Sequence, residues 1–432
     1  MQIQGEDIGL RIEVPYGLKT ASGNIRLSKS IQMIVPRKIE PLDSPSQKII
    51  RAIGKSSLAR AAFSQRSDMG SVVIAAPRPE EFPKVVEAVK AVLDSITTAG
   101  IRASEVTVLL ADVLTKSSAQ EDVLAQFRNA LPTNTSIEFH NWKDGSTTSY
   151  VGTTPTGCTP IHINTKYLQA DLKIAIGHSL PDMVHSITGV PYTIVPGIAS
   201  NSTACKTRMK AMKESPSLLN ARSSVAVDLM EGSSLPKPGI AMDFITDYSG
   251  NISSLVVGEL GSVWQKNMER SKMVMEVDCS LRADVAIVSM GGSPWDRTLY
   301  DALEGLFVST KVTREGALVI LLAECGSGVG PESFERLMRS STSAETARAE
   351  AQRHFMVGME KVPIYWEMLA TREFVIMSEL DDETVKEVCH AIPAESLQAA
   401  LAYAEKVQGI DATYAIIPYG KFTSPINESD SS

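Results

Sequence analysis

The sequence lacks the patterns that mark zinc-binding, disulfide-rich, membrane-spanning and nucleic-acid-binding proteins. Its five cysteines lie far apart and none belongs to a CxxC pair, so neither a disulfide framework nor a zinc site is indicated. No apolar run approaches the roughly 20 residues that a membrane span requires. Lys and Arg form no dense cluster and the formal net charge is -8, which excludes the usual electrostatic footprint for nucleic acid.

The N-terminus also lacks a basic segment followed by an apolar stretch, which argues against a secretory signal. We therefore expect a cytoplasmic protein with neither a membrane nor a nucleic acid as partner. Whether it forms a homo-oligomer stays open. An anionic substrate would have to be bound by a few local positive groups, because the surface as a whole is acidic.

What is present is a long chain of ordinary globular composition. It has 432 residues, of which 43% are hydrophobic and 21% charged. A single hydrophobic core seldom serves more than roughly 250 to 300 residues, so two domains are expected. We predict an N-terminal α/β domain over 1–268, a C-terminal α/β domain over 276–426, a ligand cleft between them and a disordered tail over 427–432. A helical segment near 265–275 is the predicted hinge.

Apolar strand-like segments alternate with amphipathic helical segments through most of the chain, which predicts βαβ units and mainly parallel sheets. In the first half we expect short strands and hairpins near 9–35, a helix from Ser44, and a long helix over 80–99. The remaining predicted strands are 71–76, 106–111, 136–140, 172–176, 283–289, 317–322, 374–377 and 414–418. Further helices are predicted near 299–308, 331–338 and 344–357.

Gly-rich or polar turns follow several of these strands, where α/β proteins usually place ligands. Residues 291–296 read Gly-Gly-Ser-Pro-Trp-Asp, and residues 323–328 read Ala-Glu-Cys-Gly-Ser-Gly. Arg78 lies between two prolines after the strand 71–76, where a guanidinium ahead of a helix can bind a carboxylate with two hydrogen bonds. The turn at 177–199 combines two histidines, an aspartate and a Pro-Gly-Ile run.

These segments together resemble the nickel-dependent lactate racemases, enzymes that racemise or epimerise 2-hydroxy acids. The resemblance extends from near residue 50 to residue 420. It implies a two-domain α/β fold and makes Arg78 the substrate-binding arginine. It also implies a nickel-pincer nucleotide held covalently by a lysine, and two histidines that act as bases.

The chain departs from that pattern where the family keeps its reactive residues. Thr115 and Lys116 stand in place of a His-Arg pair, and a threonine hydroxyl is no general base near neutral pH. Asp182 stands where the second basic histidine is expected. Tyr192 replaces the lysine that carries the cofactor, and tyrosine cannot form the same thioamide linkage.

A histidine ligand of the nickel is expected shortly after the lysine, yet no histidine occurs between His185 and His354. The cofactor therefore stays unassigned, with the nickel-pincer nucleotide implied only by the resemblance and no metal ligand predicted. One alternative places the anchor on another lysine such as Lys206. Lys210 and Lys213 lie on the same segment, and all three are equally consistent with the solvated face of a helix.

Four residues of the turn are the predicted catalytic groups. His178 and His185 lie in or beside it, and imidazole is the natural proton shuttle near neutral pH. Asp182 could orient one of these rings, and Tyr192 could serve as an acid. His140 matches a family His-Asp pair only in part, because Asn141 replaces the acid, and we expect a structural role for it.

In the C-terminal half the double glycine, Pro, Asp and a following Leu-Tyr pair match the family framework. Trp295 replaces a lysine there, which removes a positive charge and adds a stacking surface. The family's Gly-x-His-Lys segment corresponds to residues 358–361, again without the histidine. The glycines are explained equally well by turn geometry alone. The predicted substrate contacts are Arg78, Thr115, Lys116, Ser293, Trp295 and Asp296.

The resulting hypothesis is a racemase or epimerase that acts on a 2-hydroxy acid or a related small carboxylate by an altered, nickel-independent mechanism. Proton abstraction next to the carboxylate would give epimerisation or, in a lyase reaction, elimination. The alternative is a binding or regulatory homologue that holds a small anion without turning it over.

Overall fold

The computed structural model describes residues 9–26, 30–64, 70–112, 120–280 and 282–426. Two compact units result: unit 1 comprises Met1–Arg37 and Met275–Ser432, and unit 2 comprises Lys38–Val274. Each unit has a mainly parallel sheet with its own core, which confirms the predicted α/β class. The sequence analysis predicted one domain over 1–268, whereas in the structure Met1–Arg37 belong to the same unit as the C-terminal half. The predicted tail lies outside the described residues.

The central sheet of unit 2 has the strand order β13-β12-β9-β4-β5-β6. All neighbours in it are parallel except β12 and β13, which are antiparallel. Its strands are β4 (Val72–Ala76), β5 (Val106–Leu110), β6 (Ser136–Phe139), β9 (Leu172–His178), β12 (Ile240–Thr246) and β13 (Ile252–Gly258).

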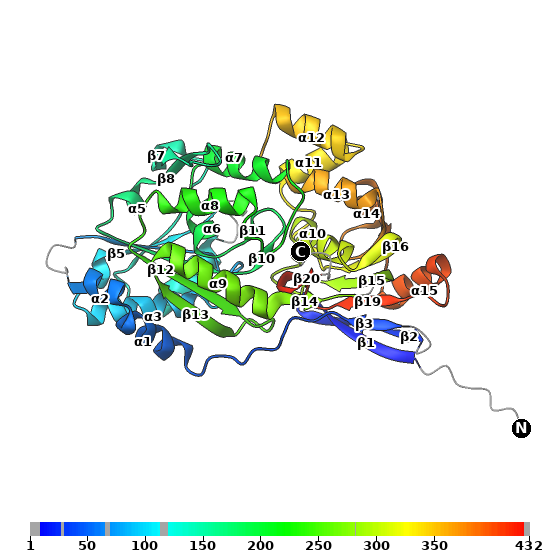
Figure 1. Ribbon diagram of the computed structural model, residues 1–432, viewed down its shortest axis with the longest axis horizontal. Coiled ribbons are helices and arrows are strands. Elements are labelled where there is room, and N and C mark those ends of the chain that lie inside the picture. Colours follow the sequence, from blue (N-terminus) through cyan, green and yellow to red (C-terminus); the bar gives the residue numbers. More distant parts are fainter. Residues whose placement is uncertain (1–8, 27–29, 65–69, 113–119, 281, 427–432) are drawn as a thin grey trace, which may run out of the picture. The chain divides into compact units, whose positions relative to one another are not determined.

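Alternate residues of these strands supply two different cores, as the period of two in a strand requires. Ile74 packs in a core that includes residues of four helices, whereas Ala75 packs in a second core with α6 and α9. Figure 1 shows α1 and α3 on one side of the sheet and α6 and α8 on the other. The helices are α1 (Pro45–Lys55), α2 (Ser57–Ser64), α3 (Val85–Thr98), α4 (Gln120–Ala130), α5 (Thr165–Gln169), α6 (Val190–Ile194), α7 (Asn201–Ala211), α8 (Ser224–Ser234) and α9 (Leu260–Met275).

Helix α3 begins five residues later than the predicted start at residue 80. Pro83 explains the delay, because the residue before a proline is driven away from the helical region. The intervening segment forms a turn in which the Phe82 amide donates to the carbonyl of Arg78. This turn holds Arg78 at the end of β4.

Two hairpins complete unit 2. Strands β7 (Thr148–Thr153) and β8 (Pro160–Asn164) pair antiparallel, as do β10 (Pro181–Asp182) and β11 (Ser186–Ile187). Neither hairpin was among the predicted strands, nor was the antiparallel pair β12–β13. Helix α9 covers the predicted hinge segment, and the two units divide at its C-terminal end. Its action as a hinge stays a prediction.

The main sheet of unit 1 is parallel throughout, in the order β18-β17-β16-β15-β19-β3. Its strands are β3 (Ile31–Met33), β15 (Ala283–Ser289), β16 (Thr313–Leu322), β17 (Glu373–Met377), β18 (Ile392–Pro393) and β19 (Tyr414–Ile417). A separate pair, β14 (Glu276–Asp278) and β20 (Ser424–Ile426), is also parallel.

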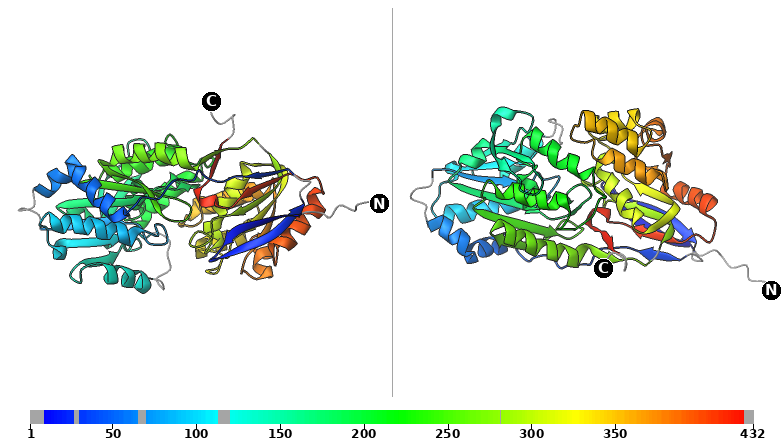
Figure 2. Two further views of the ribbon diagram at one scale, coloured as in Figure 1. Left: turned by 90° about the horizontal axis from the view of Figure 1, so that it is seen from below. Right: turned by 45° about the horizontal axis from the view of Figure 1, so that its top comes forward.

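The N-terminal hairpin, β1 (Gly9–Tyr16) and β2 (Lys19–Arg26), covers one face of this sheet. Ile12 and Val14 of the hairpin belong to the same core as Val285 and Ile320 of the sheet, together with residues of α15 (Leu397–Gln408). Figure 2 shows the blue hairpin against the yellow and red strands. The remaining helices of unit 1 are α10 (Leu299–Thr310), α11 (Glu332–Ser340), α12 (Ala344–Arg353), α13 (Lys361–Leu369) and α14 (Asp382–Glu387). Among the described helices of both units, none is long and apolar enough to span a bilayer.

Candidate functional site

Polar side chains follow the carboxyl ends of neighbouring parallel strands in unit 2. Arg78 comes two residues after β4, Asp112 two residues after β5, and His140 directly after β6, while His178 is the last residue of β9. All four are buried. Because the carboxyl ends of parallel strands meet at one edge of a sheet, the fold gathers these groups in the place where α/β proteins form ligand sites.

Arg78 is enclosed by acidic partners. Its Nη2 donates to Oε1 of Glu80 at 3.1 Å, and its Nη1 lies 3.4 Å from Oδ2 of Asp112. The guanidinium carbon lies 5.3 Å from the centre of the Phe139 ring. With only 2% of its side chain exposed, the predicted carboxylate-binding arginine is a buried cation whose charge is already balanced.

His178 uses both ring nitrogens within the unit. Nδ1 lies 2.8 Å from the carbonyl oxygen of Glu81 and Nε2 lies 2.9 Å from Oγ1 of Thr246. The ring also stacks on Phe82 with centroids 4.8 Å apart. A carbonyl can only accept, so Nδ1 carries a proton, and in the neutral ring Nε2 then accepts from the threonine hydroxyl. His178 thereby connects the Arg78 turn to β12.

His140 is likewise held by neighbours. Nε2 lies 2.8 Å from the carbonyl oxygen of Ala199 and Nδ1 lies 3.2 Å from Nδ2 of Asn164. Burial lowers the pKa of His140, and the bond to the Ala199 carbonyl only partly opposes that effect. A neutral ring joining β6 to the 195–199 segment agrees with the structural role expected from the sequence.

Asp182 and His185 form a hydrogen-bonded dyad on the β10–β11 hairpin. Oδ1 of Asp182 accepts from the backbone amides of Val184 and His185 and lies 2.9 Å from Nδ1 of His185. A carboxylate so placed fixes the tautomer with the proton on Nδ1, which leaves the lone pair on Nε2. The aspartate therefore orients the imidazole, and the imidazole is the base of the pair.

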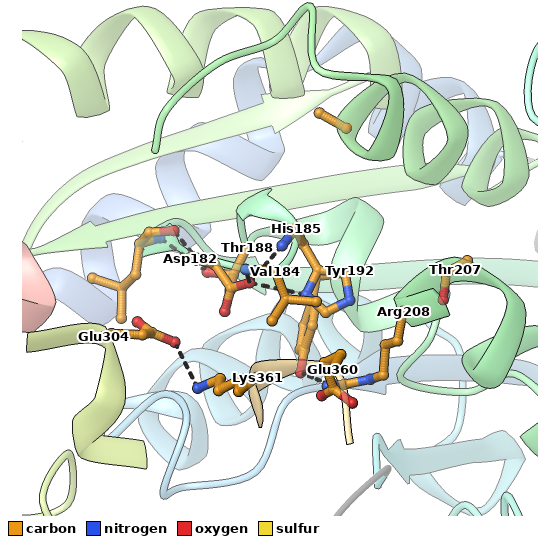
Figure 3. Close-up of polar contacts among 12 residues, drawn as sticks. Asp182, Val184, His185, Thr188, Tyr192, Thr207, Arg208, Glu304, Glu360 and Lys361 are labelled. Atoms are coloured by element: carbon orange, nitrogen blue, oxygen red, sulfur yellow. Dashed lines mark hydrogen bonds and ion pairs between the residues drawn. The ribbon is translucent and has the colours of Figure 1, made fainter. Parts of the chain in front are cut away.

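Tyr192 and Arg208 continue this arrangement. The ring of Tyr192, on α6, meets the His185 ring edge to face with centroids 5.0 Å apart. Nη2 of Arg208, on α7, donates to the Tyr192 hydroxyl at 3.3 Å. Figure 3 shows Asp182, His185, Tyr192 and Arg208 in this succession. The phenol of Tyr192 thus lies next to both the imidazole of His185 and the guanidinium of Arg208 within unit 2. The sequence analysis did not single out Arg208.

A buried carboxylate lies under the turn that carries Tyr192. Asp243 on β12 is fully buried and accepts from Ser179 Oγ at 3.0 Å and from the Val190 amide at 3.3 Å. Burial raises its pKa to about 7, although the hydrogen bonds to Val190 and Ser179 oppose that shift. Gly189 has φ +108°, and a Cβ there would lie 2.6 Å from Oδ2 of Asp243. The turn is therefore built around this acid.

The side chains at the expected anchor do not fit the pincer nucleotide of the family. Tyr192 lacks the amine that would carry the cofactor, and its hydroxyl is bonded to Arg208. The guanidinium of Arg208, the cation next to Tyr192, stays protonated and has no lone pair with which to bind a metal. No group of three or more His, Cys, Asp or Glu side chains in the described ranges is arranged to hold a metal ion.

The alternative anchors on α7 differ in availability. Lys210 pairs with the buried carboxylate of Asp228 at 3.3 Å, so its amine is already engaged. Lys206 is exposed on α7, as a solvated helix face predicts, and Lys213 is exposed two residues beyond the end of this helix. Thr115 and Lys116 lie outside the described residues, so their predicted contacts stay predictions.

In unit 1 the 291–296 loop holds the β1–β2 turn. The Ser293 amide donates to the carbonyl of Gly17, and Oδ2 of Asp296 accepts from the Gly17 amide at 2.7 Å. Asp296 is fully buried. A Cβ at Gly292 would lie 2.5 Å from the Gly17 carbonyl oxygen, so this glycine is required by backbone packing. The arrangement supports the turn-geometry explanation of these glycines.

Trp295 belongs to a second polar group in unit 1. Its ring meets Phe422 edge to face, and Nζ of Lys421 lies 5.9 Å from the ring centre. Lys421 pairs with Oε2 of Glu304 at 2.6 Å, and Lys361 lies 3.4 Å from Oε1 of the same glutamate. All three charges are buried. Of these, only Lys361 was quoted from the sequence, because charges 57 and 117 residues apart give no local signal.

Comparison with known proteins agrees with this architecture. The model of the lactate racemase N-terminal domain matches residues 16–218, and that of the lactate racemase C-terminal domain matches residues 278–422. Because these matches cover most of the sequence, the chain belongs to the lactate racemase family.

Individual relatives are distant in sequence and match most of the chain. The lactate racemase of Thermoanaerobacterium thermosaccharolyticum is 23% identical over 95% of this chain and 97% of its own length. That of Lactiplantibacillus plantarum is 22% identical over 73% and 76%. The apoprotein structure of the Thermoanaerobacterium enzyme superposes with a TM-score of 0.84 at 22% identity, covering 96% of this chain and all of that one. A Thermotoga maritima protein gives a TM-score of 0.67 at 14% identity over 91% of this chain and all of its own.

Proposed function

We propose that this protein is a racemase-type isomerase that acts on a 2-hydroxy acid or a related small carboxylate through its own side chains, without an anchored pincer nucleotide. The observation that carries the proposal is the Asp182–His185 dyad beside Tyr192, in a chain that belongs to the lactate racemase family. Similarity to two lactate racemases, one of them matched over 95% of this chain and the other over 73%, supports the substrate class.

In the proposed reaction His185 Nε2 takes the proton from the carbon next to the substrate carboxylate. The C–H electron pair moves into the carboxylate to give an enediolate, and Asp182 stabilises the imidazolium that forms. Tyr192 gives its hydroxyl proton to the opposite face of that carbon and becomes a phenolate. In the reverse direction the phenolate is the base and the imidazolium the acid, so no oxidant or reductant is consumed.

Arg78 is the proposed carboxylate-binding residue. Of its two acidic partners, Glu80 has 23% of its side chain exposed and Asp112 only 6%. A substrate carboxylate would therefore replace Glu80 and leave Asp112 in place. Thr115, Lys116, Ser293, Trp295 and Asp296 stay predicted substrate contacts, and His178 is assigned to holding the Arg78 turn.

The test is racemisation of single enantiomers of lactate and larger 2-hydroxy acids in deuterated water, followed by NMR and chiral chromatography. Proton abstraction predicts product with deuterium at the carbon next to the carboxylate, whereas internal hydride return retains hydrogen. Tyr192→Phe and His185→Gln should each lower turnover by at least about a hundredfold. Full turnover in either variant would remove that residue from the mechanism.

A second candidate function is small-carboxylate binding without turnover. The observation in its favour is that Arg78 keeps the anion-binding position while Tyr192 replaces the cofactor-bearing lysine. This function predicts that 2-hydroxy acids raise the thermal unfolding midpoint of the protein but exchange no deuterium with the solvent.

The alternative anchor on Lys206 has its own test. Intact mass and nickel analysis would be made on protein produced together with the enzymes that build the pincer nucleotide.

A further inference from the structure

Helix α7 buries a cation that the family resemblance did not lead us to expect. Its first turn is capped by Ser200, whose Oγ accepts from the Thr203 amide, and Thr203, Thr207 and Arg208 then face the interior. Only 2% of Arg208 is exposed. Burying a guanidinium is costly unless its charge is used in hydrogen bonds or ion pairs, so the contacts of Arg208 indicate what the helix holds in place.

One contact of Arg208 is with the phenol of Tyr192. Nη2 of Arg208 donates to the Tyr192 hydroxyl at 3.3 Å. On its other side the tyrosine ring meets His185, which Asp182 orients. The phenol therefore lies between the imidazole and the guanidinium (Figure 3).

We propose that Arg208 is a positioning residue for Tyr192, and that it holds the phenol oxygen and stabilises the phenolate formed when the hydroxyl gives up its proton. The inference rests on the proposed function and names the group that lets its acid change protonation state. The O–H bond breaks, the proton goes to the substrate carbon, and the electron pair stays on the phenolate oxygen. The hydrogen bond from Nη2, which already has a charged donor, then joins a cation to an anion and becomes stronger.

The experiment follows the ionisation of Tyr192 directly, in full-length protein labelled with ¹³C at the tyrosine ζ carbon. The signal of Tyr192 is the one that disappears in Tyr192→Phe. Its acid dissociation constant should be at least about tenfold larger in the wild type than in Arg208→Met, because an adjacent cation favours the charged form of an acid. Arg208→Lys keeps the charge and should fall between them.

Lys206→Met is the matched control, since it removes a cation from the exposed face of the same helix. Solvent and salt screen an exposed charge, so this variant should change the constant by less than about twofold. Arg208→Gln is a second neutral variant in case Arg208→Met does not fold. Equal constants in the wild type and a folded neutral variant would overturn the proposal, as would an equally large effect of Lys206→Met.

Turnover separates this inference from the proposed function. If Tyr192→Phe racemises as fast as the wild type, the acid role of Tyr192 fails whatever the titration shows. If Tyr192→Phe is inactive but neutral variants at Arg208 leave the dissociation constant unchanged, the role of Arg208 fails and the acid role stands. When both hold, Arg208→Met lowers kcat and leaves KM within about threefold, because the residue acts through Tyr192.

Discussion

At the scale of single residues, what surrounds a side chain decides its chemistry in unit 2. His178 and His185 are both buried histidines seven positions apart. His178 pairs with a carbonyl and a hydroxyl, both neutral, whereas His185 pairs with a carboxylate. A carboxylate stabilises a protonated ring, so His185 is equipped to accept a proton during a reaction.

Asp243 gives a prediction about pH. Its folded-state pKa is raised to about 7 from 3.8, so the folded protein binds this proton more tightly than the unfolded chain does. The contribution to stability is full below the unfolded pKa and is lost as the pH rises through about 7. Asp243→Asn should remove this dependence. Its Nδ2 could donate to Ser179 Oγ while Oδ1 still accepts from the Phe244 amide, and the lost hydrogen bond from the Val190 amide is a cost that does not vary with pH.

Relative to the wild type, Asp243→Asn should gain about 2 to 3 kcal/mol of unfolding free energy between about pH 5 and pH 8. Denaturant unfolding of both proteins at each pH measures it, and titrations elsewhere in the chain cancel in the comparison. A difference between the two proteins that does not change with pH would show that Asp243 keeps an ordinary pKa.

At the scale of elements, the turn from β9 to α6 depends on glycine. Gly189→Ala places a Cβ 2.6 Å from Oδ2 of Asp243 and forces φ +108° on a residue with a side chain. We expect the free energy of unfolding to fall by about 1 to 3 kcal/mol, which would be measured as a lower thermal midpoint. In Gly54→Ala, the control in α1, the new Cβ meets no atom within 4 Å. That change should stabilise the protein by about 0.5 to 1 kcal/mol, and equal midpoints for the two variants would contradict the account.

The same turn shows how far sequence reasoning reaches. The buried strands β4, β5, β9, β15 and β16 were predicted from local apolar runs, because each supplies its own signal. The hairpin β10–β11 has two residues in each strand and no such signal. The pairing of Asp182 with His185 could be proposed from their spacing, but that of Tyr192 with Arg208 depends on how α7 packs. From sequence alone, a single arginine on a short polar helix is expected to face solvent, and only the packing of α7 shows that Arg208 is buried.

The same limit applies to Arg78. Its position after β4 follows from the strand and the two prolines, and the sequence correctly placed it at the carboxyl end of the sheet. Its partner Asp112 follows a different strand, and only the parallel pairing of β4 with β5 brings the two together. Residues that act through non-local partners are therefore the part of the site that sequence patterns leave undetermined.

At the scale of the whole molecule, the chain order of the two units makes them unequal as folding units. Unit 2 is one continuous segment, Lys38–Val274, whereas unit 1 combines the N-terminal strands with the C-terminal half. β3 pairs with β19 at the edge of the unit 1 sheet, and the hairpin β1–β2 covers one face of it. Val285, Ile287 and Ile320 are fully buried in the whole chain, and without residues 1–37 the core that contains them would be covered by α15 alone, so we expect them to become partly exposed.

We therefore expect a fragment of residues 38–274 to unfold cooperatively on its own and a fragment of residues 275–432 to aggregate or lack a thermal transition. Burial of an aliphatic side chain contributes about 1.5 to 3 kcal/mol, so uncovering these three would cost about 4.5 to 9 kcal/mol, which is comparable with the whole stability of a typical domain. Adding residues 1–37 to the second fragment through a flexible linker should restore a cooperative transition by circular dichroism, because the hairpin and β3 then return to the sheet. A 275–432 fragment that folds without them would mean that the hairpin only decorates unit 1, and that the boundary predicted from the sequence describes the folding units better than the division at Arg37.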